Sequence, residues 1–267
     1  MTLSGCHPWS APEVPVRYTY VADALAAGEA VEYVNLYQAG LSEFPVELSG
    51  LPNLVRLGVR DNRISVIPAE IGKFKGLKWL DLGQTQINAL PAEIGQLSKL
   101  HTLYLNDCRL NKLPPEIGAL HKLKYLNLDR NQLTELPREV GNLENLHWLR
   151  LNDNKLGELP AETGKLVNLR RLYINNNELE DLPPELVGLQ NLTDLVLNGN
   201  PLGSLPGWIG ELQRLERLDV SDTGISTLPD SLAGIPGLRI IVVKNNAFSA
   251  EERQRLRELF SNRQLVF

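Results

Sequence analysis

Residues Leu123 to Asn145 read LKYLNLDRNQLTELPREVGNLEN, and this stretch carries the pattern that decides the fold. Leucines at its fourth and sixth positions, Leu126 and Leu128, alternate with other residues as in a strand that buries one face. The second half changes to helix-like spacing, with Pro137 where a helical turn begins and a glycine near its end. The stretch therefore predicts one short strand followed by one short helical turn.

The same pattern recurs every 23 residues with no insertion or deletion. Ten repeats begin at Val31, Leu54, Leu77, Leu100, Leu123, Leu146, Leu169, Leu192, Leu215 and Leu238. A proline marks the same position at Pro45, Pro68, Pro91, Pro114, Pro137, Pro160, Pro183, Pro206 and Pro229. A fixed period of this length is the signature of a solenoid, in which each repeat packs only on its neighbours. We therefore expect one elongated domain in which equivalent positions line up as columns.

The motif LxxLxLxxNxL followed by LPxEIGxL resembles the leucine-rich repeat family, in its 23-residue intracellular class. Ras-binding-type and bacterial-effector repeat proteins have similar motifs. The resemblance covers Val31 to about Phe248. It implies an α/β horseshoe of ten repeats plus terminal caps, with a parallel β-sheet on the concave side and short helical turns on the convex side. It does not imply a particular ligand.

Both ends of the chain contain residues suited to capping the solenoid. We predict a lead-in and cap over residues 1–30, the solenoid over 31–248, and a cap helix with a closing strand over 249–267. At the N-terminal end, residues 21–27 are predicted to form a short helix that ends at Gly28. At the C-terminal end, Ser249 and Glu252 fit a capping box in which Glu252 reaches back to the start of the helix. Gln264 to Phe267 are predicted to close the sheet as a short strand.

Two regular columns are explained by folding rather than by binding. The ninth position of the repeats reads Ala39, Asn62, Thr85, Cys108, Asn131, Asn154, Asn177, Asn200, Thr223 and Asn246. We expect the Asn, Thr and Cys side chains of this column to bond to backbone in a buried turn. A glutamate follows the proline by two residues at Glu47, Glu70, Glu93, Glu116, Glu139, Glu162 and Glu185. Carboxylates are favoured in the first turn of a helix, so this column marks where each helical turn starts.

Composition excludes several classes of function. The net charge of −5 over 267 residues gives no general attraction for nucleic acid, whose binding requires neutralised phosphates. Two cysteines, Cys6 and Cys108, provide neither a disulfide framework nor a zinc site, and they favour a reducing, cytoplasmic location, including a host cytoplasm for a bacterial effector. No apolar run approaches the ~20 residues that span a bilayer, so we expect no membrane insertion. We expect a monomer.

The candidate site lies at positions three, five and seven of the repeats, whose side chains are expected to point away from the core. Neighbouring strands lie ~4.8 Å apart, so we expect a zigzag aromatic band of Trp79, Tyr104, Tyr125, Trp148 and Tyr173. Tyr, Trp and Arg are enriched in binding hot spots. The predicted partner-binding residues are Tyr33, Arg56, Trp79, Tyr104, Tyr125, Asp129, Trp148, Arg150, Arg171 and Tyr173. The alternative is that these rings stack on one another and only stabilise the sheet.

Charged columns flank this band on both sides. The second position is basic or titratable at Lys78, His101, Lys124, His147 and Arg170. Near the other end of the strands lie Asp61, Asp107, Asp129 and Asp153. A partner would meet a cationic edge, an aromatic floor and an acidic edge, an arrangement that favours one orientation. The alternative is an ordinary solvated surface with cross-strand ion pairs.

The sequence contains no recognisable catalytic, cofactor or metal motif. His101 and His147 share a column but are two strands apart, too far to ligate one ion together. The predicted function is therefore recognition of a protein partner on the concave face, without chemistry. A second hypothesis is an adaptor or targeting part of a larger effector or signalling protein whose activity lies in another domain or subunit. A third is carbohydrate binding on the aromatic residues.

Overall fold

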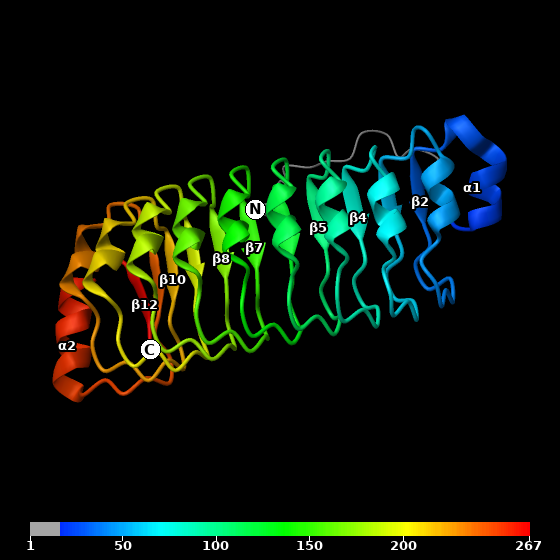
Figure 1. Cartoon of the computed structure of the whole chain (residues 1–267). Coiled ribbons are helices and arrows are strands. Elements are labelled where there is room, and N and C mark those ends of the chain that lie inside the picture. The colour runs from blue at the N-terminus through cyan, green and yellow to red at the C-terminus, as the bar shows by residue number, and fades with distance from the viewer. Residues whose placement is uncertain (1–16) are drawn as a thin grey trace, which may run out of the picture.

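A computed structural model describes residues 17–267, which form a single open sheet of twelve parallel strands (Figure 1). The strands are stacked in the order in which they occur along the chain, so no connection crosses another. They are β1 (Arg17–Tyr18), β2 (Tyr33–Asn35), β3 (Arg56–Gly58), β4 (Trp79–Asp81), β5 (Thr102–Tyr104), β6 (Tyr125–Asn127), β7 (Trp148–Arg150), β8 (Arg171–Tyr173), β9 (Asp194–Val196), β10 (Arg217–Asp219), β11 (Ile240–Val242) and β12 (Gln264–Val266). The predicted α/β solenoid with a parallel sheet is confirmed.

The register of the sheet follows the 23-residue period. Tyr125 pairs with Trp148, and the next residues pair in turn, so equivalent positions of adjacent repeats are direct neighbours. The same register joins β2 through β11. The columns predicted from the sequence are therefore physical columns on the sheet.

Short 3₁₀ helices line the other side of the stack along its length (Figure 1). They are η1 (Gly28–Ala30), η2 (Val46–Gly50), η3 (Ala69–Lys73), η4 (Ala92–Gln96), η5 (Pro115–Ala119), η6 (Arg138–Asn142), η7 (Ala161–Lys165), η8 (Pro184–Gly188), η9 (Gly207–Glu211) and η10 (Asp230–Gly234). From η2 onward, the residue just before each helix is the recurring proline. A single tight turn fits the short repeat better than an α-helix, because 3₁₀ geometry rises faster per residue.

The core is one continuous leucine-rich cluster between the sheet and the 3₁₀ helices. Leu126 in the middle of β6 is fully buried, whereas its neighbours in the strand are directed outward. The ninth-position column closes this core at the ends of the strands, as predicted. Asn131 donates from Nδ2 to the carbonyl oxygens of Leu105 and Leu128 at 2.8 and 2.9 Å. Its Oδ1 accepts from the Leu110 N–H at 3.1 Å, so one side chain joins two repeats.

Helices close both ends of the described stack (Figure 1). The predicted N-terminal helix is confirmed as α1 (Val21–Ala27), which ends where Gly28 takes a φ of 58°. Helix α2 (Ala250–Leu259) packs on the last repeat, and β12 pairs with β11. The first sixteen residues of the predicted lead-in and cap, with Cys6, lie outside the described residues.

The predicted capping box at α2 is half right. Ser249 does cap the helix, because its hydroxyl accepts from the Glu252 N–H at 3.1 Å. The Glu252 carboxylate does not turn back to the helix start but accepts from the Thr227 hydroxyl at 2.8 Å and from Arg255 at 2.7 Å. The Arg255 side chain holds the pKa of Glu252 down, to about 2. Glu252 thus fastens the cap helix to the solenoid instead of closing a local box.

Thr163 is a polar defect in the core, at a position where other repeats carry Ile, Leu or Val. It is fully buried, and its hydroxyl has no hydrogen-bond partner. Valine has the same shape without the hydroxyl, and an unsatisfied buried polar group costs ~1–3 kcal/mol. We expect Thr163→Val to raise the free energy of unfolding by about 1 kcal/mol in urea denaturation. Thr163→Ala is the control, since it removes the hydroxyl but leaves a void; equal stability of wild type and Thr163→Val would contradict the prediction.

Candidate functional site

The outward side chains of β2–β11 form a continuous surface, which we call the sheet face. In each strand the middle residue is buried and the flanking two, at positions three and five of the repeat, are directed outward. The core side of the sheet consists of leucine and other aliphatic residues, which alone satisfy the packing of the solenoid. Large aromatic residues on the sheet face are therefore not required by the fold.

Five rings are in contact along the sheet face, and we call them the aromatic row: Tyr33, Trp79, Tyr104, Tyr125 and Trp148. Successive ring centroids lie 6.3, 5.8, 5.0 and 5.5 Å apart. All five side chains are partly buried and keep an exposed portion. The rings therefore do pack on one another, as in the alternative that the sequence left open. They also keep a surface that a partner could contact.

The composition of the row differs from the predicted band at both ends. Tyr173 lies beneath the guanidinium of Arg150, 5.7 Å from its ring centroid, and the ring contacts of the row end at Trp148. Tyr33 extends the row at the N-terminal end because Gly58 leaves space for Trp79 to lean over β3. A Cβ at Gly58 would lie 3.3 Å from the indole of Trp79. A glycine among large residues in the fifth column was the available sequence signal.

Arginines cover the rings at both ends of the row. Arg56 lies 5.3 Å from the ring centroid of Tyr33 and 5.5 Å from that of Trp79. Arg171 lies 4.3 Å from the ring centroid of Trp148, within the range of cation–π attraction. Such contacts hold long side chains in place before a partner arrives, which lowers the entropic cost of binding.

Asp129 lies beneath the sheet face rather than on it. It is 1% exposed, and its carboxylate accepts from Arg150 Nε at 2.7 Å and from the Asn152 N–H at 2.9 Å. The carboxylate is too deep to touch a partner directly, in contrast to the role predicted from the sequence. Asp129 affects the sheet face indirectly, because its carboxylate holds the Arg150 side chain in place near the strand ends.

The hydroxyls of Tyr104 and Tyr125 remain protonated at neutral pH. Burial raises the pKa of Tyr125 to about 12, and the neighbouring Tyr104 adds to the effect. Burial also raises the pKa of Tyr104 and of Tyr173. The phenols can therefore act as hydrogen-bond donors or acceptors to a ligand.

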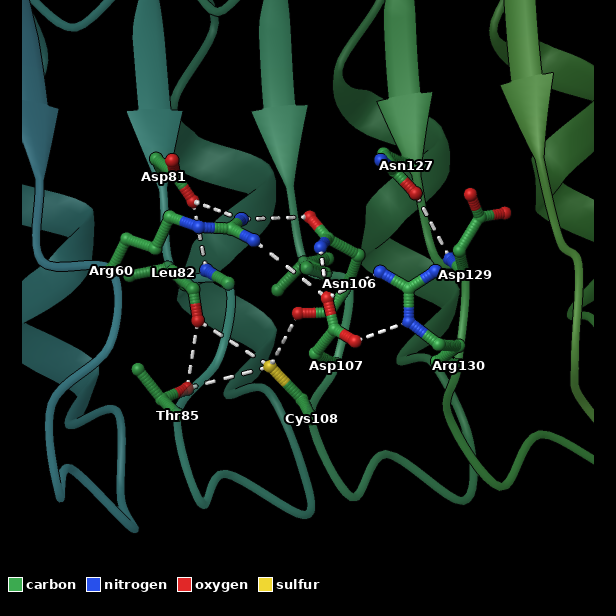
Figure 2. Close-up of polar contacts among 12 residues, drawn as sticks. Arg60, Asp81, Leu82, Thr85, Asn106, Asp107, Cys108, Asn127, Asp129 and Arg130 are labelled. Carbon is green, nitrogen blue, oxygen red and sulfur yellow. Dashed lines mark hydrogen bonds and ion pairs between the residues drawn. The ribbon is translucent and has the colours of Figure 1, made fainter.

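Part of the predicted acidic edge is neutralised, because arginines reach across repeats to Asp107 (Figure 2). Arg60 lies 3.9 Å from Asp81 and 3.7 Å from Asp107, and it donates to Asn106 at 3.2 Å. Arg130 forms a second ion pair with Asp107 and holds the pKa of that carboxyl below its usual range. The expectation of an acidic edge opposite a cationic one is therefore wrong for Asp107 and for the buried Asp129.

Arg60 is the residue of this network that the sequence analysis missed. Its side chain crosses the next repeat to reach Asp107, and Gly83 in that repeat makes room for it. A Cβ at Gly83 would lie 2.5 Å from Arg60 Nη1. Cys108 sits beside this network as predicted, buried and within 3.4 Å of the Thr85 hydroxyl and of the Leu82 carbonyl oxygen. Burial raises the pKa of the Cys108 thiol, which suits a structural role.

Within residues 17–267, no three His, Cys, Asp or Glu side chains are grouped so that they could hold a metal ion. The same range contains no helix whose length and apolar character would allow it to span a bilayer.

Models of known protein families match this chain in three stretches. A family model described as a leucine-rich repeat region matches residues 115–200, and two models described as leucine-rich repeats match residues 52–110 and 191–212. The chain belongs to the leucine-rich repeat family. A search of curated proteins gave no match to this leucine-rich repeat chain.

Solved leucine-rich repeat structures resemble the chain over most of its length. One is the ectodomain of the plant membrane receptor kinase GASSHO1/SCHENGEN3 from Arabidopsis thaliana in complex with CASPARIAN STRIP INTEGRITY FACTOR 2, with 33% identity and a TM-score of 0.70 over 76% of this chain and 26% of that one. Another is the plant peptide hormone receptor RGFR1 in complex with RGF2, with 29% identity and a TM-score of 0.71 over 82% and 37%. The chain thus spans well under half of either receptor chain. An internalin, inlF, from Listeria monocytogenes shares the fold, with 20% identity and a TM-score of 0.59 over 90% and 81%.

Proposed function

We propose that the chain is a protein-recognition module whose sheet face binds a protein partner without chemistry of its own. The observation that carries the proposal is the aromatic row, five contacting rings on the side of the sheet that the core does not use. Partly exposed Trp, Tyr and Arg side chains, held by contacts among themselves, have the composition and rigidity of binding hot spots.

The similar plant receptor structures support recognition as the general role. Each was solved in complex with a named partner molecule. The partner of this chain, its contact on the concave side and its monomeric state belong to our proposal. So does a cytoplasmic location, which rests on the sparse cysteines.

The test replaces three rings of the row together, as Trp79→Ala, Tyr125→Ala and Trp148→Ala. Immobilised wild-type and variant chains are compared for the proteins they retain from a cell extract, read by mass spectrometry. Affinity for the retained partner is expected to fall by about 30-fold or more, since hot-spot side chains contribute ~2 kcal/mol or more.

The control is Trp208→Ala, because Trp208 is a partly buried aromatic residue that packs on the core outside the sheet face. It should lower the free energy of unfolding without changing which proteins are retained. If the triple variant lost stability but retained the same partner with unchanged affinity, the row would serve only the fold, and the proposed function would be wrong.

A further inference from the structure

One edge of the sheet face, at the start of the strands, is rich in basic and titratable side chains. Position two of five successive repeats carries the side chains Lys78, His101, Lys124, His147 and Arg170. Backbone hydrogen bonds join these positions in adjacent repeats. The N–H of His101 donates to Lys78 O, and the N–H of Lys124 donates to His101 O, both at 2.8 Å. The backbone positions that carry these side chains therefore follow one another at the strand spacing of ~4.8 Å.

The turns before these strands add two more lysines. Lys99 and Lys122 stand just ahead of the strands that follow them, and both are exposed, as is Lys78. None of these three lysines forms an ion pair with any residue of the described range 17–267. Among the two residues before each repeat from Leu77 to Leu169 and the first two residues of those repeats, the sequence has one carboxylate, Glu144. At the opposite edge, in contrast, Arg60 and Arg130 both pair with Asp107.

His101 lies in the middle of this cluster. The charged groups that act on it are Lys124 from the start of β6, Lys78 from the start of β4, and Lys122 from the turn between repeats. Burial lowers the pKa of His101, and these three lysines lower it further. The neutral form therefore prevails near pH 7, and a nearby anion would favour uptake of a proton.

The orientation of the ring suits this role. His101 bonds to the backbone of Lys99, two residues before it. His147 makes the equivalent contact, with Nδ1 2.6 Å from Asn145 O. A ring fixed through one nitrogen leaves the other available, and on protonation that nitrogen becomes a second donor.

We propose that this edge is a docking site for an acidic segment of the protein partner, and that proton uptake by His101 strengthens the binding. The site consists of Lys78, Lys99, His101, Lys122 and Lys124. The inference rests on the proposed function, since the edge is continuous with Trp79 and Tyr125 of the aromatic row. Charge complementarity selects the occupant, because Lys78, Lys99 and Lys122 form no ion pair within residues 17–267, on a chain of net charge −5. The overall negative charge disfavours a long nucleic acid, whose binding would need many more cations.

The experiment measures binding of a fluorescent oligoglutamate peptide to the full chain by anisotropy, at about pH 7.5 and about pH 5.5. We expect binding to tighten about threefold at the lower pH, because His101 becomes cationic. The triple variant Lys78→Gln, Lys122→Gln and Lys124→Gln should bind about tenfold more weakly. A matched variant, Lys112→Gln, Lys155→Gln and Lys165→Gln, removes the same charge elsewhere and should change affinity by less than about twofold. Equal weakening by the two variants would overturn the site.

His101→Gln isolates the proton-linked part. It should abolish the gain at lower pH while leaving binding at about pH 7.5 within about twofold of wild type. In NMR titrations of the wild-type chain, oligoglutamate should raise the pKa of His101, because the coupling between proton and peptide is reciprocal. An unchanged His101 pKa in the presence of bound peptide would overturn the role of this residue.

The two proposals fail separately. The triple aromatic variant retains every residue of the docking site and should bind oligoglutamate like wild type even while it loses its partner. If the lysine variant bound oligoglutamate like wild type, the docking site would be wrong and the proposed function would stand. If the docking site bound oligoglutamate as expected while the triple aromatic variant kept its partner, the proposed function would be wrong and the docking site would stand. Tighter binding of oligothymidylate than of oligoglutamate would overturn the choice of an acidic protein segment.

Discussion

Replacing Asn131 by alanine is expected to lower the free energy of unfolding by about 4 kcal/mol. Asn131 is 8% exposed and joins two repeats through its side-chain amide. Alanine would leave the buried Leu105 carbonyl oxygen and Leu110 N–H without this partner, and each unsatisfied buried group costs ~1–3 kcal/mol. Because neighbouring repeats depend on each other for stability, a weakened interface in the middle of the solenoid affects the whole stack. Urea unfolding followed by circular dichroism measures the loss.

A second asparagine column provides the control. Asn168 donates to Glu144 O at 2.8 Å across a repeat boundary, but this bond lies on the exposed side of the turn. Water replaces an exposed hydrogen bond, so Asn168→Ala should cost only about 0.5 kcal/mol. Similar losses in the two variants would show that burial of the ninth column does not determine stability.

The regular part of the fold was predictable because it follows from the period alone. One register joins β2 to β11, so a 23-residue spacing places Tyr125 next to Trp148 without further information. The ninth column was predictable for the same reason, since a buried amide in a turn must bond to backbone. The 3₁₀ geometry of the turns and the true direction of the Glu252 side chain depend on packing between segments, which a single repeat does not encode.

The sheet face was predictable only in part. Strand alternation places Trp79 and Tyr104 outward, and the structure brings their rings together. Long side chains that cross whole repeats were not predictable, because column positions say where a side chain starts but not where it ends. Arg60 reaches Asp107 two repeats away, and this reach neutralises one carboxylate of the expected acidic edge.

Replacing Asp129 by asparagine is expected to lower the free energy of unfolding by about 3 kcal/mol. The Asp129 side chain is 2% exposed, and its ion pair with Arg150 measures 2.6 Å. The amide has almost the same shape, but it carries no charge and turns a donor toward the guanidinium. Removing one partner of a buried pair costs ~3–5 kcal/mol, and the 33% exposure of the Arg150 side chain reduces this figure through solvent screening.

Asp153→Asn is the matched control. Asp153 lies at the neighbouring strand-end edge and accepts one exposed hydrogen bond, from Asn176 at 2.7 Å. An amide can keep that bond, so this variant should lose less than about 0.5 kcal/mol. If the two substitutions cost the same, the buried ion pair would contribute nothing specific to stability.

A double-mutant cycle with Arg150→Met separates pairing from burial, because it measures the interaction energy of the two side chains directly. With both charges removed, neither is left uncompensated, so the double variant should lose about 1–2 kcal/mol less than the sum of the single variants. Arg150 also lies over Tyr173, next to the end of the aromatic row. The Asp129→Asn variant should therefore release Arg150 from the sheet face and weaken partner binding even at temperatures where the chain remains folded. If the Asp129→Asn variant binds the partner more weakly, Asp129 acts by positioning Arg150, because the buried carboxylate cannot touch the partner. If binding is unchanged, the role of Asp129 is limited to stabilising the strand ends.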